Sequence, residues 1–255
     1  MAIQLNDRDQ LIFKLIDEHQ VLLEKHIAWF ISGDDKPVLI RDRLRKLFYL
    51  DYLLCHRHGT KLPWWTTPTK PLVYMLSPMA RTVAGCAEPE IDLFDAEIQR
   101  HLLEVANLRM LHLQGVKEGH IKDFTWKTCK KEDGIKLDAI VSFNAQGKLH
   151  KLGIINHAAK ETLAADVEAA LKSADIEGVL IVSRDEAHQQ ILQAAISGSS
   201  ISKHCFFSTH HEVYKTGVVL SQWQGADQKC ANLFNTCAPE CTSTTTWSNA
   251  VLAIA

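Results

Sequence analysis

The sequence has no apolar run that approaches the roughly 20 residues needed to span a bilayer. Its N-terminus reaches Asp7, Arg8 and Asp9 before a signal-peptide core could form, so we expect a cytoplasmic protein with no membrane partner. The sequence also lacks an excess of charge of one sign, because 28 Lys and Arg face 30 Asp and Glu and leave a formal net charge of -2. This balance excludes a general affinity of the whole surface for nucleic acid, and any basic site must be local.

Several catalytic signatures are missing as well. The sequence has no glycine-rich phosphate loop, no Gly-x-Ser-x-Gly elbow and no His-Glu-x-x-His helix, which leaves NTPase, hydrolase and zinc-protease functions without support. The seven cysteines are odd in number and include no Cys-x-x-Cys pair, so we expect reduced thiols. Cysteines and histidines gather in the last quarter in a spacing that fits no common zinc module, and we expect no bound metal or other cofactor. These residues are His204, Cys205, His210, His211, Cys230, Cys237 and Cys241.

The composition of the chain is that of an ordinary globular protein. Of its 255 residues, 46% are hydrophobic and 23% are charged, which is enough for a sizeable core. The pattern of charge and hydrophobicity changes at residues 85–90, Gly-Cys-Ala-Glu-Pro-Glu, where turn-forming residues cluster. We therefore predict an α+β protein with two domains, residues 1–85 and residues 91–255.

Helical spacing of apolar residues predicts three short helices in the first half, ahead of two strands. The third helix begins near Pro37 and has one apolar face made by Ile40, Leu44 and Leu47. Segments 52–55 and 72–76 are typical of strands, and the stretch between them is rich in Gly, Pro and Trp. Three helices followed by a hairpin is the order of a winged helix-turn-helix domain. Trp64 and Trp65, between the strands, could stack on a base or hold this segment against the domain.

The second half is predicted to form a mixed sheet flanked by helices. A helix is expected first, then a hairpin of strands with alternating apolar residues, and then helices and buried strands in turn. The predicted elements are a helix at 91–112, strands at 135–143 and 149–155, a helix at 158–173, a strand at 179–182, a helix at 186–196, and strands at 205–207 and 218–223.

A local basic site is predicted in the third helix and the hairpin after it. Residues 36–61 contain seven basic and two acidic residues, a surplus of five positive charges. A rotation of about 100° per residue turns Arg41, Arg45 and Lys46 outward, where a recognition helix meets the major groove. Arginine can bind guanine through two hydrogen bonds, and basic side chains displace counterions from phosphates. The predicted DNA-binding residues are Lys36, Arg41, Arg43, Arg45, Lys46, Arg57 and Lys61. The alternatives are a solvated face or a protein-binding surface.

A nuclease-like pattern appears in the second half, where Asp138 lies in a strand that precedes a hairpin. In metal-dependent nucleases of the PD-(D/E)xK type, an Asp on one strand and an Asp or Glu on the next hold Mg²⁺, and a Lys two residues further on positions the attacking water. Here Asn156 replaces the second carboxylate and Ala158 replaces the Lys, so we expect no cleavage. Glu104 and Glu161, on flanking predicted helices, could substitute. An active Mg²⁺-dependent site made of Glu104, Asp138 and Glu161 therefore remains the alternative.

Short motifs spread over most of the chain resemble one known family. They are residues 5–12 (LNDRDQLI), 41–47 (RDRLRKL) with Tyr49 and Leu50 after them, 73–77 (VYMLS), 137–139, 206–209 and 217–223. Together they are similar to the replication-relaxation proteins of bacterial plasmids and other mobile elements. The resemblance implies a winged-helix DNA-binding domain joined to a restriction-endonuclease-like domain. Leu137, Asn156 and Ala158 depart from the family pattern, which implies lost cleavage with a retained fold.

The sequence thus predicts a DNA-binding regulator of plasmid or mobile-element replication or transcription. Its partners would be double-stranded DNA, a second copy of the chain and a replication or regulatory protein. The degenerate nuclease-like domain would serve dimerisation or partner binding. Two alternatives stay open: a Mg²⁺-dependent DNA endonuclease or nickase, and a protein-interaction adaptor whose basic patch binds an acidic partner.

Overall fold

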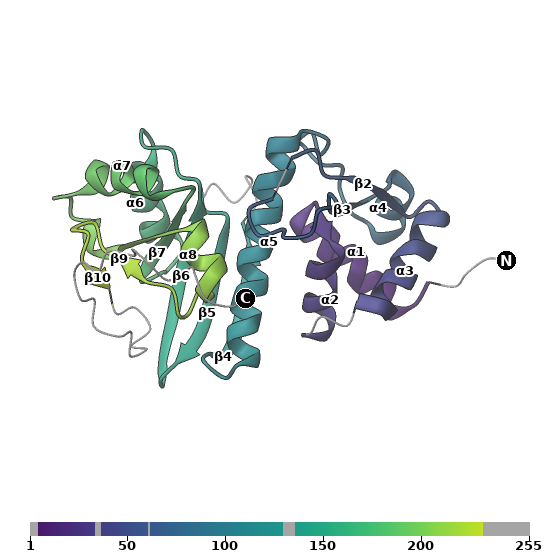
Figure 1. Ribbon diagram of the computed structural model, residues 1–255, viewed down its shortest axis with the longest axis horizontal. Helices are drawn as coiled ribbons and strands as arrows, with labels where there is room; N and C mark the ends of the chain where they lie inside the picture. Colours follow the sequence, from purple (N-terminus) through teal and green to yellow (C-terminus); the bar gives the residue numbers. More distant parts are fainter. Residues whose placement is uncertain (1–4, 34–36, 61, 130–135, 232–255) are drawn as a thin grey trace, which may run out of the picture.

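The computed structural model describes residues 5–33, 37–60, 62–129 and 136–231, and within them the chain is of the α+β class. A small three-stranded sheet lies in the first part of the chain and a mixed seven-stranded sheet in the second. Figure 1 shows a long helix, α5 (Ala96–Lys117), standing between the helices of the first part and the large sheet of the second. None of the helices in the described ranges combines the length and the apolar character that crossing a bilayer requires.

The first part of the chain consists of short helices packed on an antiparallel sheet in the order β1-β3-β2. Its elements are α1 (Asp7–His19), β1 (Leu22–Leu23), α2 (Glu24–Ser32), α3 (Pro37–Tyr49), β2 (Leu53–Arg57), β3 (Leu72–Leu76) and α4 (Pro78–Ala84). A capping box between Asn6 and Asp9 starts α1. The predicted apolar face of the third helix is confirmed, because Ile40, Leu44 and Leu47 are all buried in the core of this part.

The second part of the chain builds the seven-stranded sheet in the order β10-β9-β8-β7-β6-β5-β4. Its elements after α5 are β4 (Lys122–Thr128), β5 (Ala139–Ala145), β6 (Lys148–Asn156), α6 (Leu163–Ser173), β7 (Gly178–Ser183), α7 (Glu186–Ile196), a 3-10 helix (Ser202–His204), β8 (Cys205–Thr209), α8 (His210–Thr216), β9 (Trp223–Gln224) and β10 (Cys230–Ala231). Strands β6, β7 and β8 run parallel, and the other neighbours are antiparallel. Every residue of β7 is buried, as expected for a central parallel strand covered on both faces.

Helix α5 belongs to the packing of both parts. Its residues Leu103 and Ala106 lie in the hydrophobic clusters of the first part, whereas Leu108 and Leu111 lie in the core on the large sheet. Asp95 caps its N-terminus by accepting hydrogen bonds from two backbone amides of the first turn. The predicted boundary at residues 85–90 lies between α4 and α5, ahead of this shared helix.

Several predicted elements are displaced or shortened in the structure. The helix predicted at 158–173 begins only at Leu163, and most of the predicted strand at 218–223 is a turn, with strand geometry only from Trp223 onward. Strand β4 and helix α8 were not predicted. Strand β4 alternates between exposed and half-buried residues, so its sequence carries little apolar signal.

Candidate functional site

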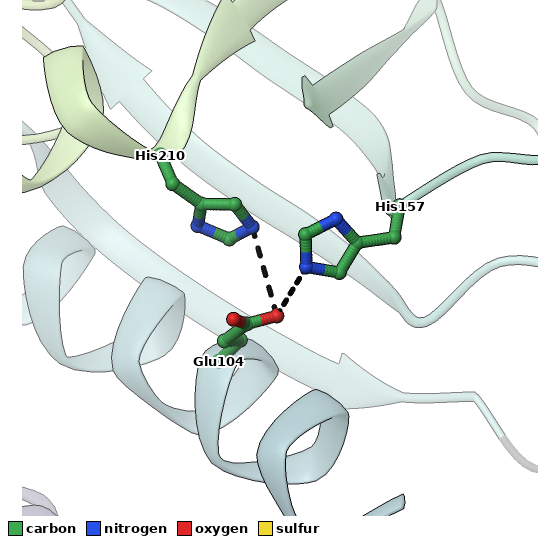
Figure 2. A group of neighbouring side chains, drawn as sticks. All are labelled: Glu104, His157 and His210. Atoms are coloured by element: carbon green, nitrogen blue, oxygen red, sulfur yellow. Dashed lines mark hydrogen bonds and ion pairs between the residues drawn. The ribbon is translucent and has the colours of Figure 1, made fainter. Parts of the chain in front are cut away.

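The most chemically distinctive cluster lies at one edge of the large sheet. Because β6, β7 and β8 are parallel, their carboxyl ends meet at the same edge, which is where α/β proteins commonly bind ligands. His157 directly follows β6, and His210 directly follows β8. Helix α5 crosses beneath this edge and supplies Glu104. Figure 2 shows both imidazole rings directed toward the Glu104 carboxylate.

Glu104 is the centre of the cluster, and its side chain is fully buried. Its Oε2 atom accepts hydrogen bonds from His157 Nε2 and from Asn156 Nδ2, the latter at 3.1 Å. Its Oε1 atom accepts one from Arg100 Nε at 3.0 Å. His210 Nε2 lies 3.7 Å from Oε2. Four side chains from three elements and one loop position therefore converge on a single carboxylate.

The two histidines are held differently. The His157 backbone is in the left-handed region, with φ 56°, and its amide donates to the Val182 carbonyl at 3.0 Å, which fixes it at the end of the sheet. The His210 side chain is only 4% exposed, and neither of its ring nitrogens has a hydrogen-bond partner among the described residues. Its ring packs between those of His157 and Tyr214, with centroid distances of 4.6 and 5.0 Å.

The protonation states follow from burial and from these contacts. Burial raises the pKa of Glu104, but the hydrogen bonds from His157 and Asn156 and the two neighbouring imidazoles together outweigh it and lower this pKa to about 2, so the group is a carboxylate at neutral pH. Burial lowers the pKa of His210 to about 3, which keeps its imidazole neutral with one nitrogen lone pair free. Burial also raises the pKa of Tyr214 well above its usual value. The cluster thus offers one anionic oxygen and an uncharged imidazole.

Asp138 lies beside this cluster and has its own partners. Its Oδ1 is 2.7 Å from His101 Nε2, and its Oδ2 accepts a hydrogen bond of 2.6 Å from the backbone N–H of Asn156. Burial lowers the pKa of His101, and the hydrogen bond with Asp138 together with the negative charges of Asp138 and Glu104 reverses this, for a net rise. Asn156 therefore links the two predicted carboxylates, because its backbone contacts Asp138 and its side chain contacts Glu104.

The three residues of the alternative magnesium site are thus placed unequally. Glu104 and Asp138 both contact Asn156, but Asp138 is outside the group of ligand atoms formed by Glu104, His157 and His210. Glu161 is an exposed turn residue before α6, and it is not a member of that group either. Asn156 and Ala158, where the nuclease pattern has a carboxylate and a Lys, are both buried.

The predicted basic residues of α3 divide into two kinds. Arg41, Arg45 and Lys46 are exposed, as predicted, and Arg41 forms an ion pair of 2.9 Å with Glu24 of α2. Arg43 differs from them. Its guanidinium binds the fully buried Asp9 carboxylate through Nε at 2.5 Å and through Nη2, and its own side chain is 17% exposed. This ion pair gives the Arg43 side chain a structural role between α1 and α3, whereas its predicted contact with DNA stays a prediction.

Arg57 borders a groove of about 530 Å³ beside β3. It donates through Nη1 to the Lys70 carbonyl at 2.8 Å. The groove combines basic, aromatic and hydroxyl side chains, among them Lys25, Arg41, Arg57, Trp64, Trp65 and Thr67. Trp64 also packs edge-on against Tyr214, with a centroid distance of 4.9 Å. Lys36 and Lys61 lie outside the described residues.

Sequence reasoning missed the role of His157 and His210 in one cluster. The signal that could have found them is a histidine directly after each of two buried strand segments, on the condition that these strands are parallel. Of the cysteines and histidines of the last quarter that the structure describes, only His210 joins the cluster, and Cys205 is a buried thiol whose pKa burial raises to about 12. Cys237 and Cys241 lie outside the described residues.

Comparisons with known proteins give no assignment for this chain. Neither the protein-family models nor the curated protein sequences include a match to it.

Proposed function

We propose that the protein is a DNA-binding regulator and that α3 is its recognition helix. The observation that carries this proposal is the exposed basic face of α3, formed by Arg41, Arg45 and Lys46, in a chain whose formal net charge is -2. A helix that presents several basic side chains on one face suits the major groove, where arginine reads guanine and lysine contacts phosphate.

The arrangement of the first part supports this proposal. Its first three helices and the antiparallel strands β2 and β3 follow the order of a winged helix, with the β2–β3 connection in the place of the wing. The groove beside β3 adds Arg57 and two tryptophans to the basic face of α3 and suits a phosphate backbone. The motifs similar to replication-relaxation proteins favour a role in replication or transcription of a plasmid or other mobile element, with double-stranded DNA as the partner.

In the same proposal the second part is a nuclease-like domain of the PD-(D/E)xK type that has lost cleavage. Asn156 and Ala158 stand where the chemistry needs a carboxylate and a Lys. Such a domain would serve to dimerise the protein or to bind a replication or regulatory protein. A nickase is the second candidate, favoured by the approach of both Glu104 and Asp138 to Asn156.

Binding to duplex DNA, measured by fluorescence anisotropy over a range of salt concentrations, tests the recognition helix. We compare Arg45→Gln/Lys46→Gln with a control of equal charge change, Lys172→Gln/Lys203→Gln, on helices beside the large sheet. Each phosphate contact contributes about −0.9 to the slope of log affinity against log salt. Loss of two contacts should flatten this slope by about 1.8 and weaken binding roughly 60-fold at 0.1 M salt. Equal binding by both variants would disprove a recognition role for α3.

A plasmid assay separates the regulator from the nickase. Supercoiled plasmid is incubated with the protein in Mg²⁺ or in EDTA, and with the Asp138→Ala variant. The proposal predicts retardation without nicking, equal under all three conditions. Nicking that requires both Mg²⁺ and Asp138 would make the protein an endonuclease. Binding of an acidic protein without any binding of DNA would instead make it an adaptor.

A further inference from the structure

We propose that Glu104, His157 and His210 bind one divalent transition-metal ion of the zinc class. The ligand atoms would be Glu104 Oε2, His157 Nε2 and a ring nitrogen of His210. This site is separate from the basic face of α3 and does not depend on DNA binding. It also differs from the Mg²⁺ site that the sequence left as an alternative, because only Glu104 is common to both.

The geometry of the three side chains is close to that of a metal site. One ligand atom from each residue lies within 4.8 Å of the other two. Bonds of about 2.0–2.2 Å to a tetrahedral ion place its ligand atoms roughly 3.4 Å apart. His210 Nε2 is 3.7 Å from Glu104 Oε2, and His157 Nε2 is in hydrogen-bond contact with the same oxygen. Small side-chain movements are therefore enough to admit an ion.

The unpartnered imidazole of His210 is an independent indication of a ligand. Buried polar side chains are nearly always hydrogen-bonded, and an exception calls for an ion or a water that satisfies it. His210 is 4% exposed, its two ring nitrogens have no hydrogen bond within the described residues, and Figure 2 shows the ring turned toward Glu104. A cation between the two side chains would give this imidazole a partner.

The donor set selects the class of metal. Two imidazoles and one carboxylate suit Zn²⁺, Co²⁺, Ni²⁺ or Fe²⁺, whereas Mg²⁺ prefers six oxygen ligands. Three protein ligands leave a coordination position open for water, which can approach past His157, whose side chain is 17% exposed. The carboxylate is already oriented for this purpose, because Arg100 holds Oε1 and Asn156 holds Oε2.

Binding of the ion requires one proton to move. His157 Nε2 cannot both donate a hydrogen to Glu104 and coordinate the metal. The proton on Nε2 leaves to solvent where the ring carries a second proton on Nδ1, and otherwise it moves to Nδ1, which has no hydrogen-bond partner among the described residues. The ion then replaces that proton between the imidazole and the carboxylate, and no oxidation or reduction is involved.

The test is a titration of the purified full chain, stripped with a chelator, with Co²⁺ and with Zn²⁺. We expect one Co²⁺ per chain, visible absorption bands of a site of low coordination number, and displacement of Co²⁺ by Zn²⁺ but not by excess Mg²⁺. Glu104→Gln, His157→Asn and His210→Gln should each weaken binding by about tenfold or more. Asn suits position 157 because it tolerates the left-handed backbone.

A matched control is available on the same sheet. His150 forms a similar contact with the Glu177 carboxylate, at 2.7 Å, but it is not a member of the three-residue ligand group. His150→Asn should therefore bind Co²⁺ as the unchanged chain does. Circular dichroism of each metal-free variant separates loss of the site from loss of the fold. One folded variant among Glu104→Gln, His157→Asn and His210→Gln is sufficient for the test. Absence of binding to the unchanged chain, displacement by Mg²⁺, or equal affinity in all folded variants would overturn the proposal.

Discussion

The same substitution at the two α3 arginines, Arg43 and Arg45, should affect different properties of the protein. Arg43 neutralises the buried carboxylate of Asp9, whereas Arg45 is exposed on the face proposed to contact DNA. We therefore predict that Arg43→Met lowers the stability of the fold and that Arg45→Met lowers DNA affinity. Methionine keeps much of the aliphatic volume in both cases, so that the charge is the main variable.

The expected loss for Arg43→Met is about 3 to 4 kcal/mol. Removing one partner of a buried ion pair costs about 3–5 kcal/mol, because the other charge stays buried. Protonation of the Asp9 carboxyl sets an upper limit, since holding an ordinary Asp side chain neutral at pH 7 costs roughly 4 kcal/mol. The hydrogen bond of 2.9 Å from the Asn6 amide to this carboxylate persists and moderates the loss. Arg45→Met should change the free energy of unfolding by no more than about 0.5 kcal/mol.

Urea denaturation followed by circular dichroism measures both effects. The midpoints give the differences in free energy if the slopes agree. The double variant Asp9→Asn/Arg43→Met should recover most of the loss, because neither charge is then left unpaired. Under conditions in which all variants are folded, Arg43→Met should keep its DNA affinity. Equal midpoints for the two single variants, or no recovery in the double variant, would refute the reasoning.

Two further predictions concern the second part of the chain. Burial lowers the pKa of His112 to about 4, whereas in the unfolded chain this imidazole has its ordinary value near 6.5. The unfolded state therefore binds a proton first, so the stability of the fold is complete above pH 6.5 and falls as the pH drops toward 4. His112→Met should abolish about 2 kcal/mol of the destabilisation that urea titrations measure between pH 7.5 and 5. A variant with unchanged pH dependence would contradict the burial argument. Gly178→Ala should lower the free energy of unfolding by about 1–3 kcal/mol in the same assay, because the new Cβ would lie 2.9 Å from the His204 carbonyl oxygen and 2.8 Å from the Phe206 ring. An unchanged midpoint would show that β7 and β8 can separate at no cost.

The sequence predicts those elements whose signal is local. The buried run of β7 and the apolar face of α3 are fixed by the side chains of consecutive residues, and both are found as predicted. Helix α8 was missed because it has only seven residues and begins with two histidines, which do not produce a helical apolar pattern. The exposed positions of Arg41 and Arg45 followed from helical rotation alone, but the partner of Arg43 did not, since Asp9 is 34 residues away in the sequence.

The candidate metal site could not be predicted for a related reason. Glu104, His157 and His210 are separated by more than 50 residues at each step, and no spacing rule connects them. They meet only because β6 and β8 lie on either side of β7 in parallel and because α5 packs against the large sheet and brings Glu104 to Asn156 at the end of β6. Glu104 was identified as a candidate carboxylate from its position on the preceding helix, but its partners are imidazoles, and Asp138 is held by His101.

Helix α5 makes the two halves of the chain energetically dependent on each other. Leu103 and Ala106 complete the core of the N-terminal half, and Leu108 and Leu111, within about two turns of them on the same helix, lie in the core on the large sheet. Arg109 donates to Glu18 of α1 at 2.9 Å, on the same helix that supplies Glu104 to the metal-ligand group. A fragment that ends at residue 85 would lack this helix and would expose the apolar residues that it covers.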